Sequence, residues 1–377
     1  MCASTSQELQ MLDTMAMEFA DSELVPGREE SDEFPFKPFF GGALRKASEV
    51  GFFSLMLPDE MGGANRSMKA LCTVLREVCR VDASLGGIIF TNALAQEVMM
   101  NAGALDMIGR PGTAGGDPQE GLLAFAPFDN PVETGNRATA RVVDGDYLMD
   151  GRVEYVVLGG LAGRVLVAAT IEGQKDLSFF LTETGREEVM ISEPVVSLGL
   201  HACPAVDIDF RGAPASIAGN QGEGELYLSQ AADRLSVACA AMAAGVMWGS
   251  FITALDYTRQ RFQGGREIVN WSQVRMMLAD MAIKLKCADL IVKAASTSVD
   301  EAEDGWQQAS RAAALHVCPI ACDVANDGIQ LLGGNGYMHE YGQEKRFRDA
   351  HHIQLLLGMP PIRKLTYVER IFDGEKQ

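Results

Sequence analysis

Positive charge is scarce in this sequence. Its 377 residues carry 32 lysines and arginines against 51 aspartates and glutamates, which gives a net charge of −19 at pH 7. Nucleic acids and anionic membrane surfaces attract proteins through an excess of lysine and arginine. The charge balance therefore argues against either of them as the main partner, and the simplest interpretation of the acidity is a well-solvated surface.

Paired metal-ligating residues are also lacking. The eight cysteines are scattered without a C-x-x-C pair, and there are only five histidines. Cys318 and Cys322 lie one helical turn apart, but no second cysteine or histidine pair completes a zinc site. We interpret the cysteines as buried thiols of a cytosolic protein. No orienting partner is evident for His351 or His352, so we expect both to be packed or surface histidines.

Targeting and membrane segments are not evident either. Met1 to Gln10 is polar, without the basic start and apolar core of a secretory signal. Crossing a bilayer requires about 20 predominantly apolar residues, and no run of that length is expected. The sequence therefore predicts a cytoplasmic protein without a membrane span.

Hydrophobic residues are plentiful, at 47% of the chain, and their spacing indicates the secondary structure. In the first 120 residues they recur at helical spacing. We expect helices at Glu8–Leu24, Ala43–Val50, Met68–Ala83 and Ser84–Ala102. The stretch from Gly103 to Gly121, rich in Gly, Pro and Asp, then predicts a linker.

From Leu122 the hydrophobic period shortens towards two, which is typical of strands. Arg141–Met149, with Asp144-Gly145-Asp146 at its centre, predicts a hairpin. Further strands are predicted at Arg164–Ile171, Leu177–Thr182, Val189–Val195 and Ala205–Phe210. Five or more short strands within about 90 residues indicate a small β domain.

After Gly222-Glu223-Gly224 the helical period returns and persists to the end. The predicted helices are Leu226–Gln263, Ser272–Asp300, Trp306–Leu332, Gln343–Leu357 and a short one at Pro361–Phe372. The four long helices imply a bundle, whose exposed apolar faces would favour oligomerisation. The pattern predicts an α+β fold with an N-terminal helical domain at 1–120, a small β domain at 121–217 and a C-terminal helical bundle at 218–377.

The most specific motifs lie near the C-terminus. Residues 330–337 read QLLGGNGY, and Arg348-Asp349-Ala350 followed by Ile353-Gln354 comes shortly after. In this order and spacing they closely resemble the C-terminal signature of the acyl-CoA dehydrogenases, and residues 51–63 resemble a second conserved passage of that family. The resemblance covers nearly the whole chain, from about Leu12 to Phe372. It implies the same architecture, an N-terminal helical domain, a small middle β domain and a C-terminal four-helix bundle.

Acyl-CoA dehydrogenases are flavoenzymes that oxidise the Cα–Cβ bond of acyl thioesters. The resemblance therefore implies FAD as cofactor, an acyl-CoA thioester as substrate and an electron-transfer flavoprotein as electron acceptor. It also implies an oligomer, either a tetramer or a dimer, of identical or different chains.

Four residues stand at positions that face the FAD dinucleotide in this family. Arg261 and Gln273 match its arginine and glutamine, and that arginine reaches the FAD of a neighbouring subunit. Gly333 and Gly334 match glycines that let the backbone approach the cofactor. Arginine suits a pyrophosphate because its planar fork donates parallel charged hydrogen bonds.

The flavin end of the site departs further from the family. Tyr155 and Val157 stand at the tryptophan and threonine that lie against the flavin, so an aromatic ring remains and a hydroxyl is lost. Residues 126–131 replace the family's T-E-P-x-A-G-S-D loop and keep little of it.

The usual catalytic glutamate of the family is missing. Its Tyr-Glu-Gly-Thr is replaced by residues 356–359, LLGM, so Leu357 stands at the base position and cannot accept a proton. A minority of the family places the glutamate directly before an arginine, where this chain has Asp233 and Arg234. Desolvation among small apolar neighbours would make Asp233 a better base, whereas a solvated acid near a helix start would have no such role. Arg234, Leu357 and Gly358 are expected to border the substrate.

Other functions on the same fold remain open. The replacements at Leu357, Met359, Val157 and residues 126–131 are also expected of a catalytically degenerate subunit in a heteromeric acyl-CoA dehydrogenase. A flavin oxidase or monooxygenase is a further alternative, because a fold alone does not decide function.

Overall fold

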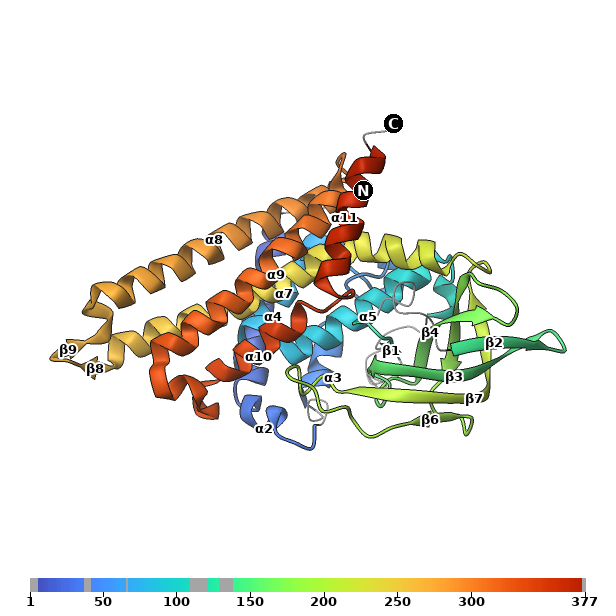
Figure 1. Ribbon diagram of the computed structural model, residues 1–377, viewed down its shortest axis with the longest axis horizontal. Helices are drawn as coiled ribbons and strands as arrows, with labels where there is room; N and C mark the ends of the chain where they lie inside the picture. Colours follow the sequence, from blue (N-terminus) through green and yellow to red (C-terminus); the bar gives the residue numbers. More distant parts are fainter. Residues whose placement is uncertain (1–5, 37–41, 66, 109–120, 129–137, 375–377) are drawn as a thin grey trace.

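The computed structural model describes residues 6–36, 42–65, 67–108, 121–128 and 138–374, and three regions follow one another along the chain. Helices form the first region, a small β-barrel the second and a bundle of long helices the third (Figure 1). The barrel lies at one end of the molecule and the bundle extends to the other. The predicted order of helical, β and helical regions is confirmed. The exact domain boundaries stay a prediction, and most of the predicted linker at 103–121 lies outside the described residues.

The first region is built on two buried helices, α4 (Met68–Val81) and α5 (Ala83–Asn101). Polar side chains fix where they begin. Ser67 accepts a hydrogen bond from the backbone of Ala70 at the start of α4, and Asp82 accepts one from Ser84 at the start of α5. The shorter helices α1 (Ser6–Phe19), α2 (Arg28–Asp32) and α3 (Gly42–Glu49) belong to the same region.

The β-barrel closes because its outer strands pair with each other. Its strands are β2 (Ala138–Val143), β3 (Asp146–Val157), β4 (Arg164–Ile171), β5 (Leu177–Glu183) and β7 (Ala205–Ala218). They pair in the order β4-β2-β3-β7-β5, and β4 also pairs with β5. Two short strands add to the barrel, β1 (Leu123–Ala124) beside β4 and β6 (Val189–Ile191) beside β7.

The hairpin between β2 and β3 forms where the sequence predicts it. Its turn at Asp144 and Gly145 has φ of 53° and 95°, the conformation that suits the twist of paired strands. Several strand ends differ from the prediction, and β3 continues to Val157, eight residues past Met149. β6 stops at Ile191 rather than Val195, and β7 continues eight residues past Phe210, to Ala218.

The bundle consists of α7 (Gly224–Gln260), α8 (Ser272–Glu301), α9 (Trp306–Leu332) and α10 (Gln343–Ile353), followed by α11 (Pro360–Gly374). Small residues on α7 let its backbone approach α4 closely. A Cβ atom added at Gly245 would lie 2.3 Å from the carbonyl oxygen of Arg76, and one at Gly249 would lie 2.1 Å from that of Arg80. The strands β8 (Phe262–Gln263) and β9 (Arg266–Glu267) form a hairpin between α7 and α8.

The expectation that no apolar run is long enough to span a membrane was wrong for α7. By length and composition this helix could cross a bilayer, but 83% of its most apolar window is buried inside the molecule. The cysteines also differ in part from the expectation. Cys318 and Cys322 are buried, but Cys287 is exposed, and Cys2 lies outside the described residues.

Candidate active site

An open groove of about 660 Å³ lies at the end of the bundle that is farthest from the barrel (Figure 1). Four residues expected at the cofactor line it together. Arg261 directly follows α7, Gln273 belongs to the first turn of α8, and Gly333 and Gly334 end α9. The fold therefore gathers side chains that are separated by up to 73 positions in the sequence.

The backbone and charge of this groove fit a dinucleotide. Gly333 has φ 59° and ψ −133°, a conformation open essentially to glycine alone, and a Cβ at Gly334 would meet nothing within 4 Å. The side chain of Arg261 makes no ion pair or hydrogen bond with any residue that the structure describes. An unpaired guanidinium beside an open backbone turn is suited to bind a pyrophosphate.

Tyr155 and Val157 belong to the last part of β3, in the barrel, and neither lines this groove. Val157 is buried, and its backbone exchanges hydrogen bonds of 3.1 and 2.9 Å with Phe125. Tyr155 has φ 58° and packs edge-on against Phe128. A single chain therefore does not bring these two residues to the groove of Arg261.

His352 was expected to lack an orienting partner, and that expectation was wrong. Its Nδ1 lies 2.7 Å from the carbonyl oxygen of Gly199, and its Nε2 lies 2.9 Å from Oη of Tyr155. A carbonyl oxygen can only accept, so Nδ1 carries the proton and Nε2 accepts from the tyrosine. Burial raises the pKa of Tyr155 to about 12 and lowers the pKa of His352. Both side chains are therefore neutral near pH 7.

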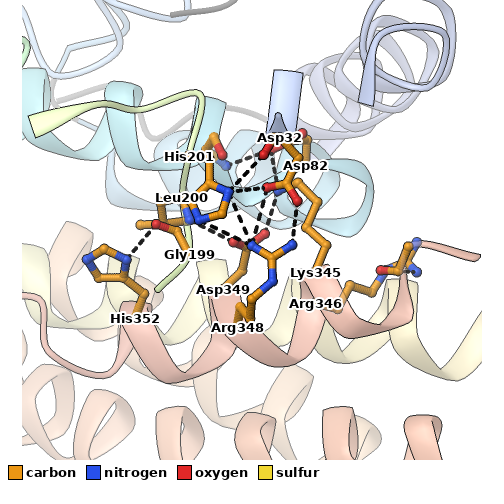
Figure 2. Close-up of polar contacts among 12 residues, drawn as sticks. Asp32, Asp82, Gly199, Leu200, His201, Lys345, Arg346, Arg348, Asp349 and His352 are labelled. Atoms are coloured by element: carbon orange, nitrogen blue, oxygen red, sulfur yellow. Dashed lines mark hydrogen bonds and ion pairs between the residues drawn. The ribbon is translucent and has the colours of Figure 1, made fainter. Parts of the chain in front are cut away.

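The Arg-Asp-Ala segment of α10 is held by a network of buried charges (Figure 2). Lys345 lies 2.7 Å from Oδ2 of Asp349 and 3.1 Å from Oδ1 of Asp82, and Oδ1 of Asp349 accepts from the backbone of Leu200 at 2.8 Å. Burial lowers the pKa of Lys345, but the carboxylates of Asp349 and Asp82 outweigh that effect and raise it. The lysine is thus a fixed positive charge between two acids.

Arg348 extends this network to α2. Its guanidinium pairs with Asp32 and, at 2.7 Å, with Glu344. Asp32, Glu344 and His339 are close enough to one another to hold a metal ion, but Arg348 already supplies a positive charge to both acids. The sequence motif therefore marks a structural junction between α10, α2 and the loop around Leu200.

Asp233, the proposed base, lies on α7 with its side chain buried. Its neighbours are not only the small apolar residues that the sequence suggested. Oδ1 accepts hydrogen bonds from Arg311 on α9 and from Arg370 on α11, the latter at 2.5 Å. None of the described residues donates a hydrogen bond to Oδ2. The next residue, Arg234, lies 3.8 Å from Glu97 on α5.

Leu357 and Gly358 form a turn after α10 that touches the loop following β1. Leu357 has φ 64°, Gly358 has φ 102°, and the backbone N–H of Leu357 donates to the carbonyl oxygen of Pro127 at 2.7 Å. Residues 129–131 of that loop lie outside the described residues. This hydrogen bond fixes the position of the Leu357 backbone, although the leucine side chain carries no acidic group.

Leu357 also lines a cavity of about 250 Å³, which we call the arginine cavity. Its lining comes from α7, α9, the turn at Leu357 and α11, and comprises Glu225, Leu228, Ser229, Ala232, Ser236, Arg311, Leu357, Arg363, Thr366 and Glu369. Burial lowers the pKa of Arg311; Asp233 raises it in part, whereas the positive charges of Arg370 and Arg363 lower it further. Sequence reasoning missed all three arginines, because no motif marks them.

Comparison with known proteins places this geometry in context. Residues 6–107 match the family described as "Acyl-CoA dehydrogenase, N-terminal domain", and residues 222–372 match "Acyl-CoA dehydrogenase, C-terminal domain". Cyclohex-1-ene-1-carbonyl-CoA dehydrogenase of Syntrophus aciditrophicus is 27% identical over 370 residues, covering 96% of this chain and 89% of that protein.

Solved structures give the same fold. Butyryl-CoA dehydrogenase from Megasphaera elsdenii has a TM-score of 0.87 at 20% identity, covering 99% of this chain and 100% of that chain. A structure described as the electron transferring flavoprotein of Acidaminococcus fermentans has a TM-score of 0.88 at 24% identity, covering 98% of this chain and 99% of that chain.

Proposed function

Because this chain belongs to the acyl-CoA dehydrogenase family, we propose that it catalyses the flavin-dependent dehydrogenation of an acyl-CoA thioester between Cα and Cβ. Proteins of this family bind FAD, which when bound would supply the acceptor for the hydride of Cβ. The chain itself must supply a place for the cofactor, a place for the thioester and a base for the α-proton.

Arg261, Gln273, Gly333 and Gly334 would hold the dinucleotide part of FAD. The open groove and the unpaired guanidinium of Arg261 support this assignment. Tyr155 and Val157 would face the flavin ring from a second subunit, because they lie on β3 in the barrel of their own chain and do not line this groove. FAD would thus be bound between two chains of an oligomer.

The observation that carries the mechanism is the free Oδ2 of Asp233. Both arginines bind Oδ1, so the carboxylate is held in one orientation while Oδ2 remains available. We propose that this oxygen accepts the α-proton of the thioester. Ala232 and Ser236, on the same helix, line the arginine cavity with Leu357, which supports a substrate position bordered by Leu357, Gly358 and Arg234.

Electrons would leave through an electron-transfer flavoprotein. The likeness to a structure described by that name supports this acceptor. A cytoplasmic location stays a prediction from the sequence.

The test is the visible spectrum of the purified full-length protein during titration with a panel of acyl-CoA thioesters. We expect bound flavin that bleaches with at least one thioester. Asp233→Asn should slow bleaching by roughly 10²-fold or more, because a positioned general base contributes that much. Asp146→Asn, an exposed acid in the barrel hairpin, is the matched control and should bleach like the native protein.

A catalytically degenerate subunit is the second candidate. It is favoured by Leu357 at the family's base position and by the commitment of Asp233 to two arginines. A protein that purifies without flavin, shows no bleaching and co-purifies with a homologous chain would support this candidate and overturn the first.

A further inference from the structure

We propose that the arginine cavity binds an oxyanion group, a carboxylate or a phosphoryl group, that is carried by the thioester ligand. This inference deepens the proposed function and rests on it for the class of ligand. Its starting point is Arg363, a residue that is 7% exposed and lines the cavity. Nη1 of Arg363 donates to the carbonyl oxygen of Leu356 at 2.9 Å, but its buried Nη2 has no hydrogen-bond partner among the described residues.

A buried guanidinium nitrogen without an acceptor is costly, because the group has lost water and gained nothing in return. Nearly all buried polar atoms in proteins are hydrogen-bonded, so an exception asks for a missing partner. Arg363 borders a cavity rather than a packed core. The simplest missing partner is an acceptor oxygen of a ligand.

The charges around the cavity lead to the same conclusion. Arg311, Arg363 and Arg370 are close enough to influence one another, and Asp233 is the one buried carboxylate that pairs with any of them in the described part of the chain. Glu225 and Glu369 also line the cavity, but both are exposed and in contact with solvent. The buried part of the cavity therefore has an excess of positive charge that an anion would neutralise.

The shape and chemistry of the cavity restrict what can enter it. A volume of about 250 Å³ admits a small group rather than a long acyl chain. A hydrocarbon there would keep water from the guanidinium groups without replacing its hydrogen bonds. A carboxylate or phosphoryl group instead offers paired oxygens that match the arginine fork, and Thr366 adds a hydroxyl to the lining.

Calorimetric titration of the full-length protein can test this with three probes that share coenzyme A. The probes are CoA alone, butyryl-CoA and succinyl-CoA, of which the last two differ by a terminal methyl or carboxylate. Each is titrated into the native protein, Arg363→Met, Arg363→Lys and the control Arg186→Met. Arg186 is exposed, near β6, and far along the chain from the cavity.

We expect Arg363→Met to raise the Kd of at least one probe by about ten- to hundredfold, the loss typical of a charged hydrogen bond. The Kd measured with Arg363→Lys should fall between the values for the native protein and Arg363→Met, and the Kd measured with Arg186→Met should match that of the native protein. A loss confined to succinyl-CoA identifies a carboxylate of the acyl group, whereas an equal loss for all three identifies a phosphate of CoA. Either result supports the cavity as an oxyanion site.

Thermal melting without ligand separates binding from folding. Arg363→Met removes an unpaired buried charge, so its Tm should equal or exceed that of the native protein. Unchanged Kd values for all three probes, or a failure of the native protein to bind any of them, would overturn the proposal. Flavin bleaching is a separate readout: binding that depends on Arg363 without bleaching would leave this site standing and remove the proposed dehydrogenation.

Discussion

Asp233 and Leu357 carry the proposed chemistry at the scale of single residues. In the proposed assignment the side chain at 357 stands where the family usually has its base, and it contributes only hydrocarbon to the arginine cavity. Asp233 supplies an acid from another helix, oriented by Arg311 and Arg370 through one oxygen. Leu357 lines this cavity together with Arg311, which binds Asp233, so we expect that a base could act from either position.

A glutamate at position 357 should restore the flavin bleaching that is lost when Asp233 is replaced by asparagine. In an Asp233→Asn background, we expect Leu357→Glu to recover flavin bleaching by roughly 10²-fold, the usual contribution of a general base. The backbone of Leu357 is already fixed by its hydrogen bond to Pro127, which favours a defined position for the new side chain. Stopped-flow absorbance measures the rate.

Leu357→Gln in the same background is the matched control, because glutamine has the shape of glutamate and no basic oxygen. Equal rescue by glutamine, or no rescue by glutamate in a protein that keeps its FAD, would contradict the assignment of the site.

α10 shows how one helix is positioned at the scale of elements. Lys345 lies between Asp82 at the start of α5 and Asp349 one turn along α10, and Asp349 also binds the loop at Leu200 (Figure 2). Removal of the lysine would leave two buried carboxylates facing each other. Such unpaired buried charges destabilise a protein far more than an exposed pair stabilises it.

Lys345→Met should therefore lower the free energy of unfolding by about 3–5 kcal/mol. Urea denaturation followed by circular dichroism measures this change. Lys364→Met, on the exposed side of α11, is the control and should change stability by less than about 0.5 kcal/mol. Similar values for the two variants would show that the buried network does not hold α10.

The distribution of cofactor residues matters at the scale of the whole molecule. Arg261 and its neighbours line a groove at the end of the bundle that is farthest from the barrel, and Tyr155 and Val157 lie on β3 in the barrel (Figure 1). The proposed FAD site would therefore require two chains. α8 offers a surface for such contact, because Met276, Ile283 and Leu290 recur every seven residues and are 62%, 61% and 56% exposed.

We expect Ile283→Glu combined with Leu290→Glu to reduce both the mass of the assembly and its FAD content, because a charge on this face would oppose subunit contact. Light scattering gives the mass, and the ratio of visible to ultraviolet absorbance gives the flavin content. Val142→Glu, at an equally exposed apolar position on the barrel hairpin, should change neither. Monomers that keep a full complement of FAD would contradict a site shared between chains.

The sequence alone determined the features that depend on neighbours along the chain. Helical periodicity predicted α4, α5, α7, α8 and α9, and alternation together with the Asp-Gly turn predicted the hairpin of β2 and β3. These features follow from short-range geometry. Only the tertiary structure decided what each side chain faces. Asp233 meets arginines 78 and 137 positions away because α7, α9 and α11 pack together, and no local pattern records which residues such a packing brings into contact.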